Sequence, residues 1–317
     1  MAARVLFLDS VHSVLEEKLT ADGYICEHDY VCSIDELRNK INDYRGLVIR
    51  SRLIIDEQLL SSAGQLTFIA RSGSGLENID VRYAASKGIH CFNSPEGNRD
   101  AVGEHALGML LSLLNKISKG DSEVRKLMWK REENRGLEIG GKTIGIIGYG
   151  NTGKSFAKKL SGFSCDVITY DRYVENAGDA YAVQTDLGEL FERADVVSVH
   201  IPYSKDNHYF VNSEFMSSFR KNIYLINTSR GKVLNSKDLV TALKSGKVNG
   251  ACLDVLEFEK HSFEEVEFDS VPESLSYLIN SDKVLLTPHV AGWTEESYYK
   301  LSSVLYDKIS STFGKPK

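Results

Sequence analysis

Short β-rich apolar runs alternate with helix-length segments along this chain, and this alternation constrains the fold more than any other feature. Parallel strands need crossover connections, so the pattern is typical of a parallel sheet covered by helices. A chain of 317 residues also has room for two domains at about 150 residues each. We therefore expect two doubly wound α/β domains. The runs that we interpret as strands are 5–8, 47–50, 68–71, 90–93, 143–148, 166–171, 196–200, 224–228, 250–255 and 284–288.

Two further segments stand apart from this rhythm. Apolar residues recur with helical spacing over 101–114, which predicts a buried helix that links the two domains. The stretch 257–281 is acidic, aromatic and irregular, with Pro272 inside it. We interpret this stretch as a long surface loop.

Composition excludes several classes of protein. The formal net charge of −6 argues against a general nucleic-acid binder. No apolar stretch approaches the ~18 residues that span a bilayer, and the N-terminus lacks the pattern of a secretory signal. The five cysteines are few and form no Cys-x-x-Cys, and no His-Glu-x-x-His occurs. These features predict a cytoplasmic protein with reduced thiols, no metal site, and no membrane or nucleic-acid partner.

A glycine-rich loop, Gly148-Tyr149-Gly150-Asn151-Thr152-Gly153, follows a predicted strand and opens a helical pattern. In a dinucleotide-binding turn the first glycine permits the tight turn and the second lets the backbone approach a pyrophosphate, while the third permits close packing of helix on strand. The same residues also match a phosphate-binding P-loop, with Gly148 and Gly153-Lys154-Ser155 at the required spacing. The loop alone does not separate these two functions.

Asp171 ends the next predicted strand, where a carboxylate accepts hydrogen bonds from an adenosine ribose and repels a 2′-phosphate. This position favours NAD over NADP, although the adjacent Arg172 would attract such a phosphate. A P-loop protein would instead use Asp171 or Asp254 as a magnesium ligand.

Three strand ends in the second half carry residues suited to chemistry. They are the segments 225–231, 253–259 and 287–292, which contain Ser-Arg-Gly, Leu-Asp-Val-Leu-Glu-Phe-Glu and Pro-His-Val-Ala-Gly. In an open α/β sheet ligands bind beyond the carboxyl ends of the strands. We therefore expect an arginine, a carboxylate and a histidine to converge there.

With the glycine loop, these motifs resemble the D-isomer-specific 2-hydroxyacid dehydrogenase family, and within it the phosphoglycerate dehydrogenases. The resemblance covers nearly the whole chain in the family's order. It implies a flavodoxin-like substrate-binding domain formed by 1–97 and 290–317. It also implies a Rossmann NAD-binding domain over 98–289, including the linking helix.

The resemblance implies a catalytic set of Arg230, Glu259 and His289. Arg230 would hold the substrate carboxylate and polarise the carbonyl, because its guanidinium is a rigid charged fork. His289 would take or return the hydroxyl proton, and Glu259 would hold the second ring nitrogen. Lys260 stands where the family usually has proline, which leaves Glu257 as an alternative carboxylate. No metal is required, since the cofactor performs the redox step.

The same resemblance implies NAD as the cofactor, with Asp254 accepting a hydrogen bond from the nicotinamide carboxamide. The residues expected to bind NAD are Gly148, Gly150, Asn151, Thr152, Gly153, Asp171, His200, Pro202, Thr228, Ser229, Asp254, Ala291 and Gly292.

Two segments are expected to bind substrate. Ser72, Gly73, Ser74 and Gly75 resemble the family loop whose amides hold the substrate carboxylate. Arg50, Ser51 and Arg52 suit a phosphate, and the implied substrate is 3-phosphoglycerate. The chain ends at Lys317 without the regulatory extension of some phosphoglycerate dehydrogenases, so we do not expect feedback by serine through such a domain. A homodimer through the linking helix is implied as well.

Three other functions remain as alternatives. One is reduction of another 2-keto acid such as glyoxylate or hydroxypyruvate. The second is an NADH-responsive binding protein on the same fold. The third is a P-loop ATPase or kinase. Formate oxidation is disfavoured, because formate has no hydroxyl proton for a histidine–glutamate pair to remove.

Overall fold

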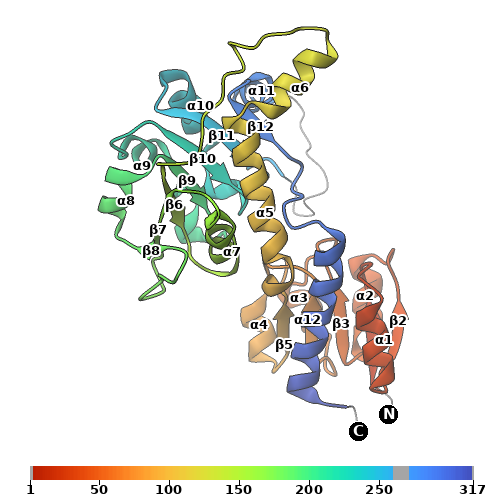
Figure 1. Ribbon diagram of the computed structural model, residues 1–317. Helices are drawn as coiled ribbons and strands as arrows, with labels where there is room; N and C mark the ends of the chain where they lie inside the picture. The colour runs from red at the N-terminus through yellow and green to blue at the C-terminus, as the bar shows by residue number, and fades with distance from the viewer. Residues whose placement is uncertain (1–2, 260–270, 316–317) are drawn as a thin grey trace. The chain divides into compact units, whose positions relative to one another are not determined.

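The computed structural model describes residues 3–259 and 271–315 of the chain. These residues form two compact units (Figure 1). The first unit contains the chain up to Asn98 and from Trp293 onward. The second contains Arg99–Glu259 and, within the described residues, 271–292.

The first unit is built on five parallel strands in the order β2-β1-β3-β4-β5. This is the flavodoxin-like order of a doubly wound sheet. The strands are β1 (Arg4–Phe7), β2 (Ile25–His28), β3 (Gly46–Ile49), β4 (Phe68–Arg71) and β5 (His90–Asn93).

Alternate side chains of β1 enter two different cores of this unit. Val5 and Phe7 pack with Leu305 and Ile309 of the last helix, whereas Leu6 belongs to the core on the other face. A strand buried on both faces reads as a continuous apolar run, which is why β1 was recognisable in the sequence. The helices of the unit are α1 (Val14–Ala21), α2 (Ile34–Lys40), α3 (Glu57–Leu60), α4 (Val81–Ser86) and α12 (Glu295–Phe313), with a 3₁₀ turn η1 (Ile41–Asp43).

The second unit is built on seven parallel strands in the order β12-β11-β10-β9-β6-β7-β8. Counted within the unit, the order reverses between its first and fourth strands, β6 and β9, as in a dinucleotide-binding Rossmann fold. The strands are β6 (Thr143–Ile147), β7 (Asp166–Tyr170), β8 (Val183–Gln184), β9 (Val196–Val199), β10 (Ile223–Asn227), β11 (Val248–Leu253) and β12 (Val284–Leu286).

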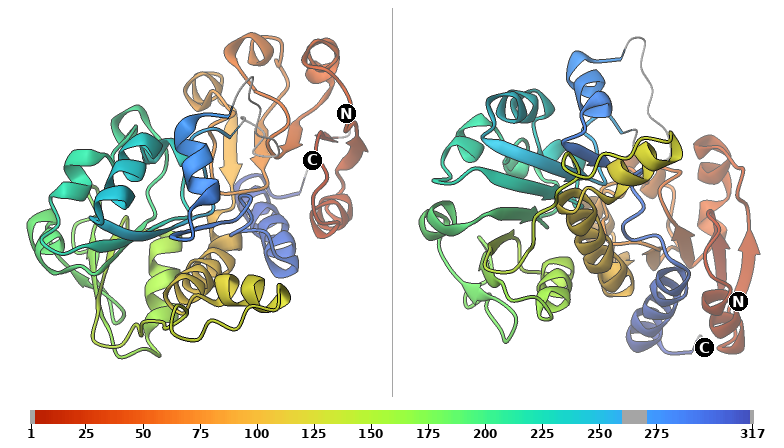
Figure 2. Two further views of the ribbon diagram at one scale, coloured as in Figure 1. Left: turned by 90° about the horizontal axis from the view of Figure 1, so that it is seen from above. Right: turned by 45° about the horizontal axis from the view of Figure 1, so that its top comes forward.

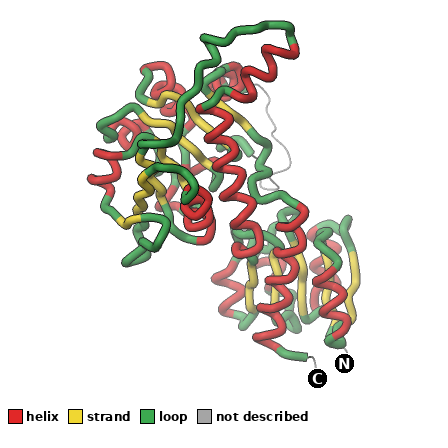
Figure 3. Tube along the Cα trace, in the orientation of Figure 1, coloured by secondary structure: helices red, strands yellow, loops and turns green. Residues whose placement is uncertain are grey.

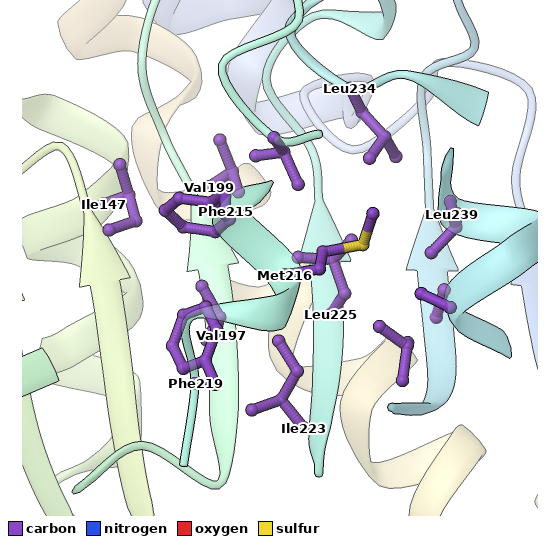
Figure 4. Close-up of a cluster of buried hydrophobic side chains, with 14 of the residues drawn as sticks. Ile147, Val197, Val199, Phe215, Met216, Phe219, Ile223, Leu225, Leu234 and Leu239 are labelled. Atoms are coloured by element: carbon purple, nitrogen blue, oxygen red, sulfur yellow. The ribbon is translucent and has the colours of Figure 1, made fainter. Parts of the chain in front are cut away.

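Helices cover both faces of this sheet (Figures 2 and 3). The buried side chains on one face include Val197, Val199 and Leu225, which pack with Phe215 and Met216 of a covering helix (Figure 4). The helical elements that complete the description are α5 (Pro95–Leu114), α6 (Ile117–Arg125), α7 (Asn151–Leu160), α8 (Leu187–Arg193), α9 (Ser213–Ser217), α10 (Ser236–Ser245), α11 (Glu273–Asn280), η2 (Lys205–Asn207) and η3 (Gly231–Val233).

The predicted fold class is confirmed, and each of the ten predicted strands is present to within two residues at its ends. Two short edge strands, β2 and β8, were missed because their residues are mostly half-exposed or exposed and lack an apolar run. The predicted helix 101–114 is part of α5, which starts earlier, at Pro95.

The expectation of a loop over 257–281 was wrong for its last third. α11 begins directly after its N-cap residue Pro272, and it forms because Leu275 and Leu278 bury one face of the helix. The segment 260–270 lies outside the described residues. No helix in the described ranges is both long and apolar enough to cross a bilayer.

Candidate active site

The glycine-rich segment forms the turn between β6 and α7. Gly148 has φ +90°, a conformation that side chains disfavour. A Cβ at Gly153 would lie 2.2 Å from the carbonyl oxygen of Gly148, so this turn closes only without a side chain there. A Cβ at Gly150 would meet no atom within 4 Å, so space remains beside the helix N-terminus. Free backbone N–H groups and the positive end of a helix stabilise a pyrophosphate, and the turn fits one.

The same turn does not fit a P-loop. α7 already begins at Asn151, so Gly153, Lys154 and Ser155 lie inside the helix instead of closing a loop around phosphates. Ser155 is buried, and its hydroxyl donates to Asp100 at 3.3 Å instead of being open to a magnesium ion. The ATPase or kinase alternative therefore loses its structural basis.

A pocket of about 140 Å³ adjoins the turn, lined by Gly150, Asp171, Arg172, His200 and Pro202 among others. Asp171 directly follows β7. Its carboxylate accepts hydrogen bonds from the backbone N–H groups of Tyr149 at 2.8 Å and of Tyr173 at 2.9 Å. These bonds fix a carboxylate at the pocket wall, where a ribose hydroxyl is bound in such folds.

Two polar atoms at positions predicted to bind NAD are buried without a partner among the described residues. They are Nδ1 of His200 and Oγ1 of Thr228. The other ring nitrogen of His200 lies 2.8 Å from Oγ of Ser198, and burial lowers the pKa of the imidazole to about 4. Buried polar atoms usually have a partner, so both are suited to a bound ligand.

The three predicted chemical segments follow β10, β11 and β12, which are neighbours in the parallel sheet. Their carboxyl ends therefore meet at one edge. At the end of β10, Asn227 accepts hydrogen bonds from the N–H and hydroxyl of Ser229 through Oδ1, at 3.0 and 2.8 Å. The Arg230 guanidinium donates to the carbonyl of Ser229 at 2.7 Å. A Cβ at Gly231 would lie 1.9 Å from the carbonyl oxygen of Leu256, so this close approach explains the glycine of Ser-Arg-Gly.

The structure brings Glu259 and His289 together. Nδ1 of His289 lies 2.7 Å from Oε2 of Glu259, and the side chains are 24% and 12% exposed. The other oxygen of Glu259 accepts from the backbone N–H of Leu256. Glu257, the alternative carboxylate, instead accepts from the N–H of Ser236 at 3.2 Å. Geometry thus favours Glu259 as the partner of the histidine.

Asp254 anchors the segment that carries His289. Its carboxylate is 1% exposed and accepts from the N–H groups of Val290 and Ala291, both at 2.9 Å. The hydroxyl of Thr287 donates to the same carboxylate at 2.6 Å. The predicted contact of Asp254 with a nicotinamide carboxamide stays a prediction, because both of its oxygens are already hydrogen-bonded inside the protein.

In the first unit, the two arginines of the Arg-Ser-Arg segment have different surroundings. Arg52 donates to the carbonyls of Leu8 and Cys32, at 2.9 and 2.8 Å, and lies 3.6 Å from Asp9. The guanidinium of Arg50 lies over the ring of Trp293, 4.4 Å from its centroid. The Arg52 guanidinium thus donates to protein carbonyls, whereas the Arg50 guanidinium lies on an aromatic face and donates to none of the described residues.

The loop over Ser72, Gly73, Ser74 and Gly75 is braced within the same unit. The N–H of Ser72 donates to the carbonyl of Ile49 at 2.8 Å, and the hydroxyl of Ser74 donates to Asn98 at 2.7 Å. The loop follows β4, at the same edge of the sheet as the Arg-Ser-Arg segment after β3.

Sequence reasoning missed three contributors: Trp293, His105 and Thr287. Trp293 directly follows Pro-His-Val-Ala-Gly, but nothing in the sequence pairs it with Arg50. His105 lies in α5, and its Nε2 lies 3.0 Å from the Thr287 hydroxyl. Among the described residues, no group of three His, Cys, Asp or Glu side chains is placed to hold a metal.

The fold, the glycine turn and the histidine–carboxylate pair define a two-unit dinucleotide-binding protein. A family model described as D-isomer specific 2-hydroxyacid dehydrogenase, NAD binding domain, matches residues 107–291. The chain belongs to this family, and NAD as its cofactor is thereby confirmed.

Known relatives differ in length and in name. The chain is 29% identical to a D-3-phosphoglycerate dehydrogenase of Archaeoglobus fulgidus, over 96% of this chain and 56% of that protein. It is 31% identical to a hydroxypyruvate reductase of Thermotoga maritima, over 88% of each. Among solved structures, a D-lactate dehydrogenase from Aquifex aeolicus, complexed with NAD and lactic acid, has a TM-score of 0.81 at 27% identity, over 98% of this chain and 95% of that one. The chain spans little more than half the length of the first relative.

Proposed function

We propose that this chain catalyses hydride transfer between NAD and a D-2-hydroxy acid. The observation that carries this proposal is the 2.7 Å contact between His289 and Glu259, beyond the carboxyl ends of the strands of a dinucleotide-binding sheet. A histidine whose second nitrogen is held by a carboxylate is suited to transfer a proton at neutral pH. A protein that only sensed NADH would not need this pair.

The roles of the residues follow from their chemistry. In reduction, His289 donates the proton that converts the keto oxygen into a hydroxyl, and in oxidation it accepts that proton. Glu259 keeps the ring in the tautomer that performs this transfer. Arg230 binds the carboxylate of the acid and stabilises negative charge on the reacting oxygen. Bound NAD supplies the acceptor, and in its reduced form the donor, of the hydride.

The second unit is proposed to hold NAD and the first to hold substrate, with the limits 98–289 and 1–97 plus 290–317. The pyrophosphate would contact the turn of Gly148, Gly150 and Gly153 and the first residues of α7. Asp171 would accept from the adenosine ribose and disfavour a 2′-phosphate. Nδ1 of His200 and Oγ1 of Thr228 supply the buried polar atoms that lack partners in the described chain.

We further propose phosphohydroxypyruvate and 3-phosphoglycerate as the substrate pair. The support is the identity to phosphoglycerate dehydrogenases and the state of Arg50. A guanidinium fork binds a phosphoryl group through charge-assisted hydrogen bonds. In this proposal Arg50 binds the phosphoryl group. Arg52 has a structural role, because its guanidinium already donates to the carbonyls of Leu8 and Cys32.

NADH absorbance tests this function directly. Purified protein is offered phosphohydroxypyruvate, hydroxypyruvate and glyoxylate, and the series is repeated with Arg50→Ala. Arg82→Ala is the matched control, because Arg82 is an exposed arginine of the same unit. We expect the phosphorylated keto acid to be preferred, and only Arg50→Ala to remove that preference.

Two results would change the proposal. Turnover of glyoxylate or hydroxypyruvate without preference for the phosphate would preserve the dehydrogenase and overturn the phosphate assignment. NADH binding without turnover of any acid would instead indicate an NADH-responsive binding protein.

A homodimer completes the proposal. α6 and the residues after it expose large apolar side chains: Ile117 is 58%, Leu127 95% and Trp129 78% exposed. Exposed apolar surface of this kind marks protein–protein contacts, and a second copy of the chain is the proposed occupant. Sedimentation should give a dimer for the wild type and a monomer for Leu127→Ser/Trp129→Ser. A monomeric wild type would contradict this assignment.

A further inference from the structure

A chain of hydrogen bonds runs from α5 to the segment that carries His289. Nε2 of His105 lies 3.0 Å from Oγ1 of Thr287, and that hydroxyl lies 2.6 Å from Oδ1 of Asp254. A carboxylate only accepts, and it is a stronger acceptor than the Met109 sulfur 3.7 Å from the same hydroxyl, so the hydroxyl gives its single proton to Asp254. The contact with His105 therefore requires a proton on Nε2. The direction of the chain is thus fixed, from the imidazole through the hydroxyl to the carboxylate.

Asp254 is a buried anion that needs such partners. Burial of a carboxylate is costly unless it is hydrogen-bonded and paired. Two backbone N–H groups and one hydroxyl bond to it, and Nε2 of His105 lies 3.6 Å from Oδ1. In the described part of the chain, His105 is the one basic side chain whose nitrogen lies within 4 Å of the Asp254 carboxylate.

The backbone that Asp254 holds is strained. His289 has φ +55°, in the left-handed region that costs a residue with a side chain about 1 kcal/mol. Such a conformation persists only where its surroundings impose it. The backbone N–H of His289 donates to the carbonyl of Asp254 at 2.8 Å, and the next two N–H groups donate to its carboxylate. Asp254 thus fixes the backbone from which the imidazole reaches Glu259.

We propose that His105 is a positioning residue for His289, and that it acts through Thr287 and Asp254. This inference rests on the proposed function, in which His289 transfers the proton. His105 orients Asp254 through the Thr287 hydroxyl, and Asp254 in turn holds the left-handed backbone at His289. The protein therefore uses two histidines: His289 transfers the proton, and His105 helps to position His289.

Serial action distinguishes this role from ordinary packing. If His105 acts through the Thr287 hydroxyl, removal of either group breaks the same chain, so the two losses should not add. Two independent packing contacts would lose activity and stability additively. We therefore compare His105→Leu, Thr287→Val and the double variant by kcat, by KM for the keto acid and by thermal stability.

The controls match the chemistry of the changes. Thr287→Ser retains the hydroxyl, and His105→Gln retains an N–H donor near the position of Nε2. Thr169→Val removes a hydroxyl of the same unit that is buried and, among the described residues, donates to the carbonyl of Ile146 at 3.2 Å. It makes the same threonine-to-valine change without removing a hydrogen bond between His105, Thr287 and Asp254.

We expect Thr287→Val to lower kcat by about 10-fold to 100-fold, the effect of misplacing a catalytic group by a fraction of an ångström to 1 Å. KM should change by less than a factor of about 2, because substrate binding is not the function lost. The double variant should match Thr287→Val, Thr287→Ser should restore most of kcat, and Thr169→Val should retain it. Additive losses, or equal kcat in Thr287→Val and Thr169→Val, would overturn the proposal.

A second readout does not depend on turnover. The proton shared by His289 and Glu259 should give a downfield resonance in the proton NMR spectrum, assigned by its absence in His289→Asn. We expect this resonance to shift or vanish in Thr287→Val and to persist in Thr169→Val. An unchanged resonance in Thr287→Val would refute the positioning role. Absence of turnover in the wild type would refute the proposed function instead. The NMR comparison would then still test whether His105 positions His289 through Thr287 and Asp254.

Discussion

Acidification should destabilise the second unit through His200, and replacing this residue should reduce that sensitivity. Burial lowers the pKa of His200 to about 4, against about 6.5 for an imidazole in an unfolded chain. Its Nε2 contacts Ser198, and Nδ1 has no partner in the described residues, so no group compensates a buried positive charge. The native protein therefore keeps this imidazole neutral.

The sign and size of the effect follow from these two values. Between pH 6.5 and 4 the unfolded chain binds a proton that the native protein does not, so stability is lost as the pH falls. The loss between pH 7 and pH 5 is about 2 kcal/mol, and the full difference of about 2.5 pH units corresponds to about 3 kcal/mol. His200→Gln retains a donor for Ser198 but does not titrate, so this component should be absent from the variant.

Urea unfolding followed by circular dichroism at pH 7 and pH 5 measures this difference. Other groups titrate equally in both proteins, so the comparison of their pH dependences isolates His200. Wild type should lose about 2 kcal/mol more than His200→Gln. Equal losses in the two proteins, or an NMR titration of His200 near pH 6.5 in the native protein, would refute the reasoning.

Three further changes test the turn, the catalytic pair and the helix that the sequence did not reveal. Gly153→Ala places a Cβ 2.2 Å from the carbonyl of Gly148, and it should lower stability by about 1–3 kcal/mol and weaken NADH binding in a fluorescence titration; unchanged binding would contradict the geometry of the turn. Glu259→Gln should lower kcat by about 10²-fold or more while Glu257→Gln retains it in the NADH assay, and the reverse order would move the catalytic role to Glu257. Leu278→Ala empties a fully buried position of α11 and should cost about 2–5 kcal/mol by chemical denaturation, whereas a cost below about 1 kcal/mol would mean that α11 contributes little to the core.

The features that sequence predicted well are those whose physical cause is local. Central parallel strands are buried on both faces and therefore appear in the sequence as continuous apolar runs. Such runs predicted β3 and β10. β8 is two residues long at the edge of its sheet, and its exposed side chains carry no such signal. The glycine loop predicted a phosphate-binding turn, but its sequence matched both a dinucleotide-binding turn and a P-loop. Only the start of α7 at Asn151 separated them, and helix starts are poorly defined by sequence.

Long-range partners account for what the sequence did not reveal. In the sequence, Arg50 and Arg52 flank a serine and cannot be told apart. In the structure, the guanidinium of Arg52 donates hydrogen bonds to the backbone carbonyls of Cys32 and Leu8. Backbone carbonyls have no signature in a sequence, so this difference could not be predicted. His105 and Thr287 are 182 residues apart, and only the fold shows that they touch. The matched motif already placed Glu259 ahead of Glu257, and the contact of Glu259 with His289 favours the same choice.

The stereochemical course of hydride transfer tests the central claim most directly. The wild-type protein is given NADH deuterated at C4 together with phosphohydroxypyruvate, and the product is analysed for deuterium at C2 and for configuration. We predict deuterium at C2 of the D-hydroxy acid, formed by the wild type and not by His289→Asn. An L product, or equal turnover by His289→Asn, would contradict the assignment of this chain as a D-2-hydroxy acid dehydrogenase that uses His289 as its acid–base group.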